Sequence, residues 1–190
     1  MKVFLLMGPP GAGKGTQARK LVEKYHWTHI ATGDLLREEI RLGTSRGQAV
    51  QALVESGKLV PDELMIELVE SRLTDGGTYL LDGFPRTLGQ AQALEELLTR
   101  KGAQLTGVLF LEVPEAELIQ RLLRRSHAEG RADDTPHTIQ TRLQEYRAKT
   151  APLLSYYEER GILYRVPGLG DVEEIGNQIA KIVETLLSSP

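Results

Sequence analysis

The sequence predicts an α/β protein with a five-stranded parallel sheet covered by helices on both faces, a three-layer α/β/α arrangement. Short apolar runs alternate along the chain with longer segments of helical periodicity, which is typical of parallel sheets with crossover helices. One such run, 'GVLFLEV' at residues 107–113, is apolar without alternation, as expected of a strand buried on both faces. The expected strands are residues 2–7, 29–31, 79–82, 107–113 and 162–166.

Helices are expected between these strands, and three of them begin near a proline. Pro61, Pro114 and Pro136 each open a helical segment in the favoured first-turn position. Asp134 or Thr135 can cap the helix that Pro136 opens. The expected helices are residues 14–25, 34–42, 45–56, 61–74, 87–101, 114–125, 136 to about 157, and 172–187.

The composition is that of a soluble globular protein. At 190 residues the chain fits one domain, with 26% charged and 41% apolar residues. It has no cysteine, which excludes disulfides, thiolate zinc sites and cysteine nucleophiles. The N-terminal apolar run, residues 3–7, is shorter than the core of a signal peptide, and no stretch approaches the ~20 apolar residues of a membrane span. We therefore expect a cytoplasmic protein that makes no membrane contact.

Charge is unevenly placed along the chain. The net charge of −3 argues against general nucleic-acid binding. Residues 121–149 nevertheless hold seven basic side chains against four acidic ones, so this segment is +3 and the remainder is −6. A local arginine cluster in an acidic protein suits a small polyanionic ligand better than a nucleic acid. Charge alone favours a solvated helix face with ion pairs, so a polyanion site needs further support.

A phosphate-binding loop supplies that support. Gly8, four further residues, Gly13 and Lys14 follow the first apolar run and precede a helical segment. Glycines let successive backbone N–H groups converge on phosphate oxygens, the next helix adds its N-terminal dipole, and Lys14 can reach the β- and γ-phosphates. The usual pattern puts Ser or Thr directly after the Lys, whereas here Gly15 precedes Thr16. An ordinary glycine-rich turn is the alternative, but strand, Lys and helix together favour a nucleoside triphosphate site.

Further polar features point to the same edge of the sheet. Asp82 ends an apolar strand, where a carboxylate beside a phosphate loop is placed to hold magnesium or its waters. His26 and His29 lie three residues apart, but no third ligand completes a metal site there. Residues 31–59 and 126–136 interrupt the strand–helix alternation, and such insertions build ligand sites and lids in α/β proteins.

Several long motifs together resemble the adenylate kinases of the nucleoside monophosphate kinase family, within the P-loop NTPase type of fold. They occur in the right order along essentially the whole chain: 'GPPGAGKGTQ', 'TGDLLR', 'GKLVPDEL', 'DGFPRTLGQ', 'RLLRR', 'GRADD' and 'RLQEYRAKTAPLLSYYEERG'. This family also has Gly-Lys-Gly-Thr in its loop, so Gly15 departs from the general pattern but not from the family's. The resemblance implies reversible transfer of the γ-phosphoryl group of ATP to AMP, giving two ADP, with Mg²⁺ bound alongside ATP.

Residue chemistry agrees with that reaction. A phosphate acceptor is already an anion at neutral pH, so no general base is needed, and no His–Asp or Cys–His pairing that would serve as one is evident. The reaction needs positive charge around two repelling phosphates and exclusion of water. Arginines provide the charge and a mobile polar lid excludes the water.

For the ATP side, the resemblance assigns the phosphates, the base and the metal to separate groups of residues. Thr16 and Asp82 act on Mg²⁺ mainly through water, since magnesium commonly keeps several waters. Arg121 lies against the base, Arg125 lies at the phosphates, and Gly170 approaches the adenine through its backbone. The residues that cradle the phosphates are Gly11, Ala12, Gly13, Lys14, Gly15 and Thr16.

For AMP and the transferring group, the resemblance assigns residues from four segments. Thr32 meets the base, Arg37 and Arg86 hold the phosphate, and Gln90 reads the adenine edge. Arg131 in the lid and Arg142 on the following helix hold the phosphoryl group in flight, whereas Arg124 and Arg147 are left as solvated or ion-paired surface. The remaining AMP-binding residues are Lys58, Leu59, Val60, Gly83, Phe84 and Pro85.

The resemblance also divides the single domain, residues 1–190, into parts. The core is residues 1–30, 60–125 and 137–190, the NMP-binding segment is 31–60, and the lid is 126–136. The lid is of the short type, without the cysteine zinc site that longer lids often carry, and a monomer is expected. Asp133 and Asp134 either pair with lid arginines on closure or cap the following helix.

Two other functions remain to be separated from this one. UMP/CMP kinases share the fold and chemistry but tend to have Ala in place of Thr32 and Asn in place of Gln90, so the two residues favour AMP. GTP-driven switch proteins also carry a phosphate loop, but they read guanine with an Asn-Lys-x-Asp motif. The only asparagine of this chain is Asn177, which is not in such a motif.

Overall fold

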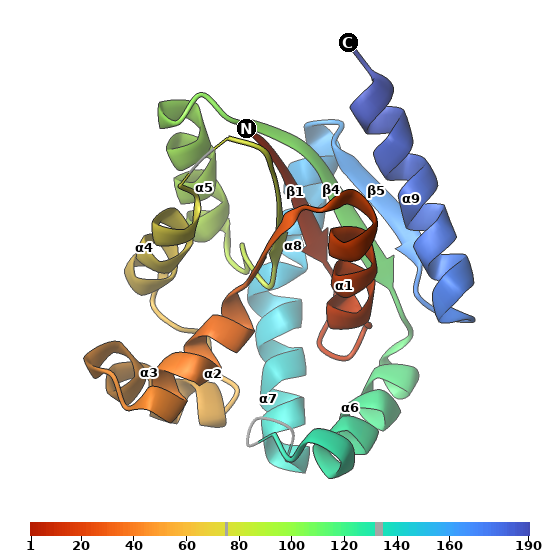
Figure 1. Cartoon of the computed structure of the whole chain (residues 1–190). Helices are drawn as coiled ribbons and strands as arrows, with labels where there is room; N and C mark the ends of the chain where they lie inside the picture. The colour runs from red at the N-terminus through yellow and green to blue at the C-terminus, as the bar shows by residue number, and fades with distance from the viewer. Residues whose placement is uncertain (75, 132–134) are drawn as a thin grey trace.

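A computed structural model of the chain describes residues 1–74, 76–131 and 135–190. Within these ranges the strands form one five-stranded, all-parallel sheet in the order β2-β3-β1-β4-β5 (Figure 1). This confirms the predicted fold class. No helix in the same ranges is long and apolar enough to cross a membrane. The strands are β1 (Lys2–Met7), β2 (Thr28–Ala31), β3 (Thr78–Asp82), β4 (Gln104–Glu112) and β5 (Leu163–Pro167).

The central strand β1 shows how the three layers form. Its side chains alternate between the two faces of the sheet, and Val3 to Met7 are each at most 4% exposed. Val3, Leu5 and Met7 belong to one apolar cluster, with α4 (Asp62–Arg72), α5 (Leu88–Arg100) and α8 (Pro152–Glu159). Phe4 and Leu6 belong to the other, with α1 (Lys14–Tyr25), α6 (Glu115–Glu129) and α9 (Val172–Ser188). Both faces are therefore covered, which explains the continuous apolar runs.

The topology fixes where a ligand can bind. The chain leaves β1 towards β2 on one side of the sheet, and leaves β4 towards β5 on the other. The connections after these neighbouring strands diverge, which opens a crevice at the carboxyl ends of the strands. The loop after β1 begins at this crevice. In Figure 1, α2 (Thr32–Leu42) and α3 (Ser45–Glu55) lie beyond the end of the sheet at lower left, α6 lies at lower right, and α7 (Pro136–Glu145) lies between them.

Several predicted helix ends need correction. Pro61 and Pro114 are N-cap residues rather than first-turn residues, and only Pro136 lies at the start of its helix. Thr135 caps that helix, because its hydroxyl accepts a hydrogen bond from the Thr138 N–H at 3.2 Å. Helix α6 continues to Glu129, into the segment expected to be a loop, since no helix breaker occurs before Gly130. Asp133 and Asp134 lie outside the described residues.

The helix predicted from residue 136 to about 157 is not continuous. Between α7 and α8 the residues Tyr146–Thr150 form a π-helical turn, η2, in which the Ala151 N–H donates to the Tyr146 carbonyl at 2.7 Å. Pro152, two residues after the end of this turn, lacks an N–H, and in a regular α-helix its ring would clash with the Ala148 carbonyl. The wider turn accommodates the proline and keeps the two helices end to end (Figure 1).

Candidate active site

The phosphate-loop motif forms the turn between β1 and α1. Gly11 and Gly13 have φ values of 85° and 96°, in the left-handed region that favours glycine. At Gly11 there is also no room for a side chain, because a Cβ would lie 2.9 Å from the Leu122 Cγ and 3.1 Å from the Leu118 carbonyl oxygen. A Cβ on Gly13 would meet nothing within 4 Å. The loop thus packs against α6 on one side and leaves open space at the N-terminus of α1, where an anion binds favourably.

Lys14 is held by its own loop. Its Nζ donates hydrogen bonds to the Gly8 carbonyl at 2.9 Å and to the Pro9 carbonyl at 3.1 Å. Desolvation by burial lowers the pKa of Lys14 from 10.5 to about 7. Asp82 acts in the opposite direction and raises that pKa, while Arg86, Arg142 and Arg125 lower it further. The site therefore gathers positive charge around a lysine that an anionic ligand would stabilise.

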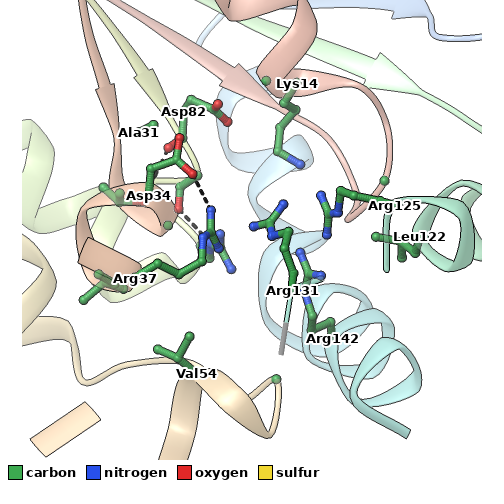
Figure 2. Close-up of a pocket in the computed structure, with 18 of the residues that line it drawn as sticks. Lys14, Ala31, Asp34, Arg37, Val54, Asp82, Leu122, Arg125, Arg131 and Arg142 are labelled. Carbon is green, nitrogen blue, oxygen red and sulfur yellow. Dashed lines mark hydrogen bonds and ion pairs between the residues drawn. The ribbon is translucent and has the colours of Figure 1, made fainter. Parts of the chain in front are cut away.

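A cavity of about 400 Å³ opens at the carboxyl ends of the strands. The phosphate loop forms one wall, Thr32 and Arg37 of α2 with residues 58–60 form the opposite wall, and α6 and α7 close a third side. Its volume lies within the range of small-molecule sites. Figure 2 shows Lys14, Arg125, Arg131 and Arg142 pointing into a common space, with Arg37 across from them. The predicted site residues that line it are Gly11, Gly13, Lys14, Gly15, Thr16, Thr32, Arg37, Lys58, Leu59, Val60, Asp82, Gly83, Arg86, Gln90, Arg121, Arg125, Arg131 and Arg142.

The six arginines that were predicted to bind nucleotide differ in burial from Arg124 and Arg147 on the nearby surface. All six are partly buried and line the cavity. Arg124 and Arg147 are exposed and pair with Glu117 and Glu115, as predicted. Cations brought together in a partly desolvated space repel one another, so an arrangement of this kind suits an anionic ligand. The arginines concerned are Arg37, Arg86, Arg121, Arg125, Arg131 and Arg142.

Arg121 connects two loops as well as lining the cavity. Its guanidinium donates to the Ala12 carbonyl at 3.3 Å and to the Gly168 carbonyl at 2.9 Å, and it pairs with Glu117 at 3.0 Å. Ala12 belongs to the phosphate loop, and Gly168 belongs to the loop after β5. Arg121 thus fixes the position of one loop relative to the other.

The opposite wall contains two buried polar side chains. Thr32 is 1% exposed and Gln90 is 2% exposed, and both line the cavity. The Gln90 Oε1 accepts a hydrogen bond from the backbone N–H of Arg86 at 2.7 Å. Its side-chain NH₂ group is left to donate, because an acceptor oxygen must face the Arg86 amide. Arg37 pairs with Asp34, three residues earlier on α2 (Figure 2).

Comparison with known proteins identifies the family. Residues 6–162 match the family model described as "Adenylate kinase". The chain belongs to the adenylate kinase family. It is 49% identical over 174 residues to an adenylate kinase of Thermus thermophilus, with 92% of each chain covered. It is 46% identical over 186 residues to one of Leptospira biflexa, covering 96% of this chain and 100% of the other. An adenylate kinase of Synechococcus sp. is 47% identical over 183 residues, covering 95% and 98%.

Four predicted residues of this adenylate kinase family member lie outside the main cavity. Ala12 is buried at 3% exposure and contributes its carbonyl to Arg121. Phe84 and Pro85 line a smaller adjoining cavity of about 50 Å³, together with Lys14 and Arg86. Gly170 has φ 108° in the loop that precedes α9, two residues beyond the Gly168 carbonyl that Arg121 holds. These four residues therefore belong to the loops around the site and do not line the main cavity.

Sequence reasoning missed other residues of the cavity. Arg19 could have been found, because it lies four residues after Gly15 on α1 and so shares its helix face. Gly57 is needed because a Cβ there would lie 2.8 Å from both the Thr138 carbonyl oxygen and the Arg142 Cγ, a contact that no local pattern reveals. The other lining residues that were not predicted are Ala31, Gly33, Asp34, Leu36, Val54, Met65, Leu122 and Glu129.

The oxygen donors near the loop are of the kind that magnesium prefers. Asp82 and Thr16 both line the cavity, and no group of three or more His, Cys, Asp or Glu side chains clusters within the described ranges. One carboxylate and one hydroxyl suit Mg²⁺, which completes its shell with water and phosphate oxygens. His29, on β2, was not predicted to take part, and the sequence showed no His–Asp pairing; the structure places its Nε2 3.5 Å from the Asp82 Oδ2, because β2 and β3 are neighbouring strands.

Proposed function

We propose that this protein transfers the terminal phosphoryl group of ATP reversibly to AMP, giving two ADP, and so maintains the balance of adenine nucleotides. The observation that carries the proposal is the cavity of about 400 Å³ in which the phosphate loop faces arginines from several elements. A donor triphosphate and an acceptor phosphate bring repelling charges together, and convergent cations offset that repulsion.

On the donor side, the backbone of the phosphate loop, residues 11–16, cradles the ATP phosphates. The bound phosphates replace the two carbonyls as partners of Lys14 and raise its pKa, so the lysine becomes fully charged. Arg121 and the loop that contains Gly170 flank the adenine. Because Arg121 ties this loop to the phosphate loop, it holds the base and phosphate sites at a fixed separation.

On the acceptor side, Arg37 and Arg86 bind the AMP phosphate, and residues 58–60 with Thr32 surround the ribose and base. Gly83, Phe84 and Pro85 shape the loop that carries Arg86. The Gln90 NH₂ group donates to N1 of adenine, which is an acceptor. The corresponding nitrogen of uracil or guanine is a donor, so Gln90 disfavours UMP and GMP. Cytosine presents an acceptor there, and CMP must be excluded by other contacts.

The transfer needs no general base, since the acceptor is already an anion. Arg125, Arg131 and Arg142 stabilise the charge on the phosphoryl group between donor and acceptor, and Arg86 holds the acceptor oxygen in line. An arginine in this role is worth about 10³–10⁵ in rate. Thr16 and Asp82 hold Mg²⁺ mainly through water, and the ion supplies further charge neutralisation on the phosphate oxygens.

The two inserted segments bring the substrates together. Residues 31–60 form the NMP-binding segment, and residues 126–136 act as a short lid that excludes water when it closes. The core is residues 1–30, 60–125 and 137–190. We further propose a cytoplasmic monomer, to be tested by fractionation of the source cells and by sedimentation at the mass of one chain.

Steady-state rates test the proposal directly. ADP formation from ATP should be at least about tenfold more efficient with AMP than with UMP, CMP or GMP, the ratio that about 1.4 kcal/mol of specificity provides. In the reverse direction, ADP alone should yield ATP and AMP in equal amounts. Faster turnover of UMP or CMP would replace the proposal with a UMP/CMP kinase. Tight GTP binding without transfer to any monophosphate would indicate a switch protein.

A further inference from the structure

Arg86 lies in a loop, so its position depends on hydrogen bonds from its surroundings. The loop between β3 and α5 contains no helix or strand at residues 83–87. The Arg86 Nε donates to the Gly83 carbonyl at 2.7 Å, and its backbone N–H donates to the Gln90 Oε1 at 2.7 Å. Both partners lie within four residues of Arg86. These two bonds hold the shape of the loop itself.

Two hydrogen bonds tie this loop to distant parts of the chain: the Thr87 hydroxyl donates to the Asp62 Oδ1 at 3.1 Å, and the second is made by the Arg86 carbonyl itself. The Thr150 hydroxyl donates to the Arg86 carbonyl at 2.7 Å, across 64 residues of sequence. Thr150 is buried at 7% exposure. A buried hydroxyl and a carbonyl that satisfy each other stabilise their arrangement, and loss of either partner leaves the other unsatisfied.

Thr150 is the last residue of the π-helical turn, and its hydroxyl does not make the usual helical bond. In a helix, a threonine hydroxyl commonly bonds the carbonyl four residues earlier. Thr141, in α7, does so by donating to the His137 carbonyl at 3.2 Å. At Thr150, by contrast, the hydroxyl donates to the Arg86 carbonyl of the loop after β3 and not to the Tyr146 carbonyl four residues earlier.

The same column of helices carries Arg142. Helix α7, η2 and α8 follow one another end to end (Figure 1), and Arg142 extends from α7 into the cavity (Figure 2). Thr150 therefore links the helix that carries Arg142 to the loop that carries Arg86. We propose that Thr150 is a positioning residue, which fixes the AMP-phosphate arginine Arg86 relative to Arg142. The inference rests on the proposed function.

The Thr150→Val substitution tests it, since valine has the same shape and lacks the hydroxyl. We expect roughly a tenfold loss of kcat/KM for AMP, with the KM for ATP changed by less than about twofold. Thr150→Ser should retain most of the kcat/KM for AMP, because serine keeps the hydroxyl. Thr141→Val is the matched control: it removes another buried hydroxyl from the same helices and should leave both KM values near those of the unsubstituted protein.

The outcomes separate this inference from the proposed function. If the unsubstituted protein does not phosphorylate AMP, the proposed function is wrong. If it does, and Thr150→Val keeps its kcat/KM for AMP or raises the KM for ATP as much as the KM for AMP, Thr150 is not a positioning residue for Arg86. Thermal unfolding of each variant verifies that it is folded. Calorimetric titration with AMP alone, in which Thr150→Val should bind more weakly than Thr141→Val, gives a readout that does not depend on turnover.

Discussion

The two halves of the cavity are constructed in different ways. The phosphate loop is one continuous stretch between β1 and α1, and its shape follows from glycines at positive φ and the helix that begins at Lys14. The arginines that face it come from α2, the loop after β3, α6, the segment before α7, and α7 itself. A continuous loop can be recognised from local sequence, whereas the arginine half exists only when separate elements meet. Substitutions in the two halves should therefore have different effects on turnover, substrate binding and stability.

The largest effect is expected in the arginine half. Arg125→Ala and Arg86→Ala should each lower turnover at least about 100-fold, because each removes a cation from beside the transferring or accepting phosphate. Arg124→Ala is the matched control on the same helix, since Arg124 is exposed and pairs with Glu117. Steady-state kinetics with ATP and AMP measure the turnover of all three variants. Near-normal turnover in Arg125→Ala or Arg86→Ala, in a folded protein, contradicts the assignment of that residue.

An intermediate effect is expected where the inserted segment contacts α7. Gly57→Ala should raise the KM for AMP roughly tenfold, because positive φ and the Thr138 carbonyl 2.8 Å away both oppose a Cβ. Gly43→Ala, in the same segment, has φ 67° but meets nothing within 4 Å. Both variants strain the backbone, but only Gly57→Ala also meets a close contact. The difference between their KM values for AMP therefore measures the effect of the close contact alone. Equal KM values for AMP would show that the contact with α7 does not matter.

The smallest effect is expected in the stability of the nucleotide-free protein. The pKa of Lys14 is about 7 in the folded state, below its ordinary value of 10.5, so the unfolded chain binds more protons between these pH values. Below about pH 7, charged Lys14 therefore lowers the free energy of unfolding by its full amount. This unfavourable contribution decreases as the pH rises and disappears towards pH 10.5. Lys14→Met should raise the melting temperature at pH 6.5 by at least about 2 °C, the shift that ~1 kcal/mol gives at this size.

That advantage of Lys14→Met should shrink as the pH rises to 9.5, which calorimetry or circular dichroism can follow. Phosphoryl transfer should be lost at every pH, since the lysine is needed when phosphates are bound. A melting-temperature difference that does not vary with pH would mean that Lys14 is not desolvated in the nucleotide-free protein.

The elements whose signals are local were predicted well. All five strands overlap their predicted ranges, and α1 has the predicted bounds. The errors arose where a neighbouring residue changes the geometry. Pro152 converts one predicted helix into α7, η2 and α8, and the helix-compatible residues before Gly130 extend α6 into the predicted lid. Pro152 indicates a break in the helix, but the sequence does not say that the break takes the form of a π-helical turn with the helices kept end to end.

The candidate site divides in the same way. Its phosphate loop and Asp82 could be predicted from spacing at the ends of apolar runs, and the resemblance supplied the arginines. Gly57 and Thr150 could not be predicted, because their partners lie 81 or more and 64 residues away, on elements whose packing no single segment encodes. Arg19 is an intermediate case, since helical spacing from Gly15 would have revealed it.

By itself, the sequence determined the parallel sheet, the turn that can bind phosphate, most helix starts to within two residues and the family to which the chain belongs. Those features depend on periodicity, glycine conformations and caps, which act over a few residues. Only the tertiary structure decided that six partly buried arginines face one loop, that Lys14 is desolvated among them, and that Thr150 reaches Arg86. These depend on distances between elements far apart in the chain, which are fixed only when both faces of the sheet are packed.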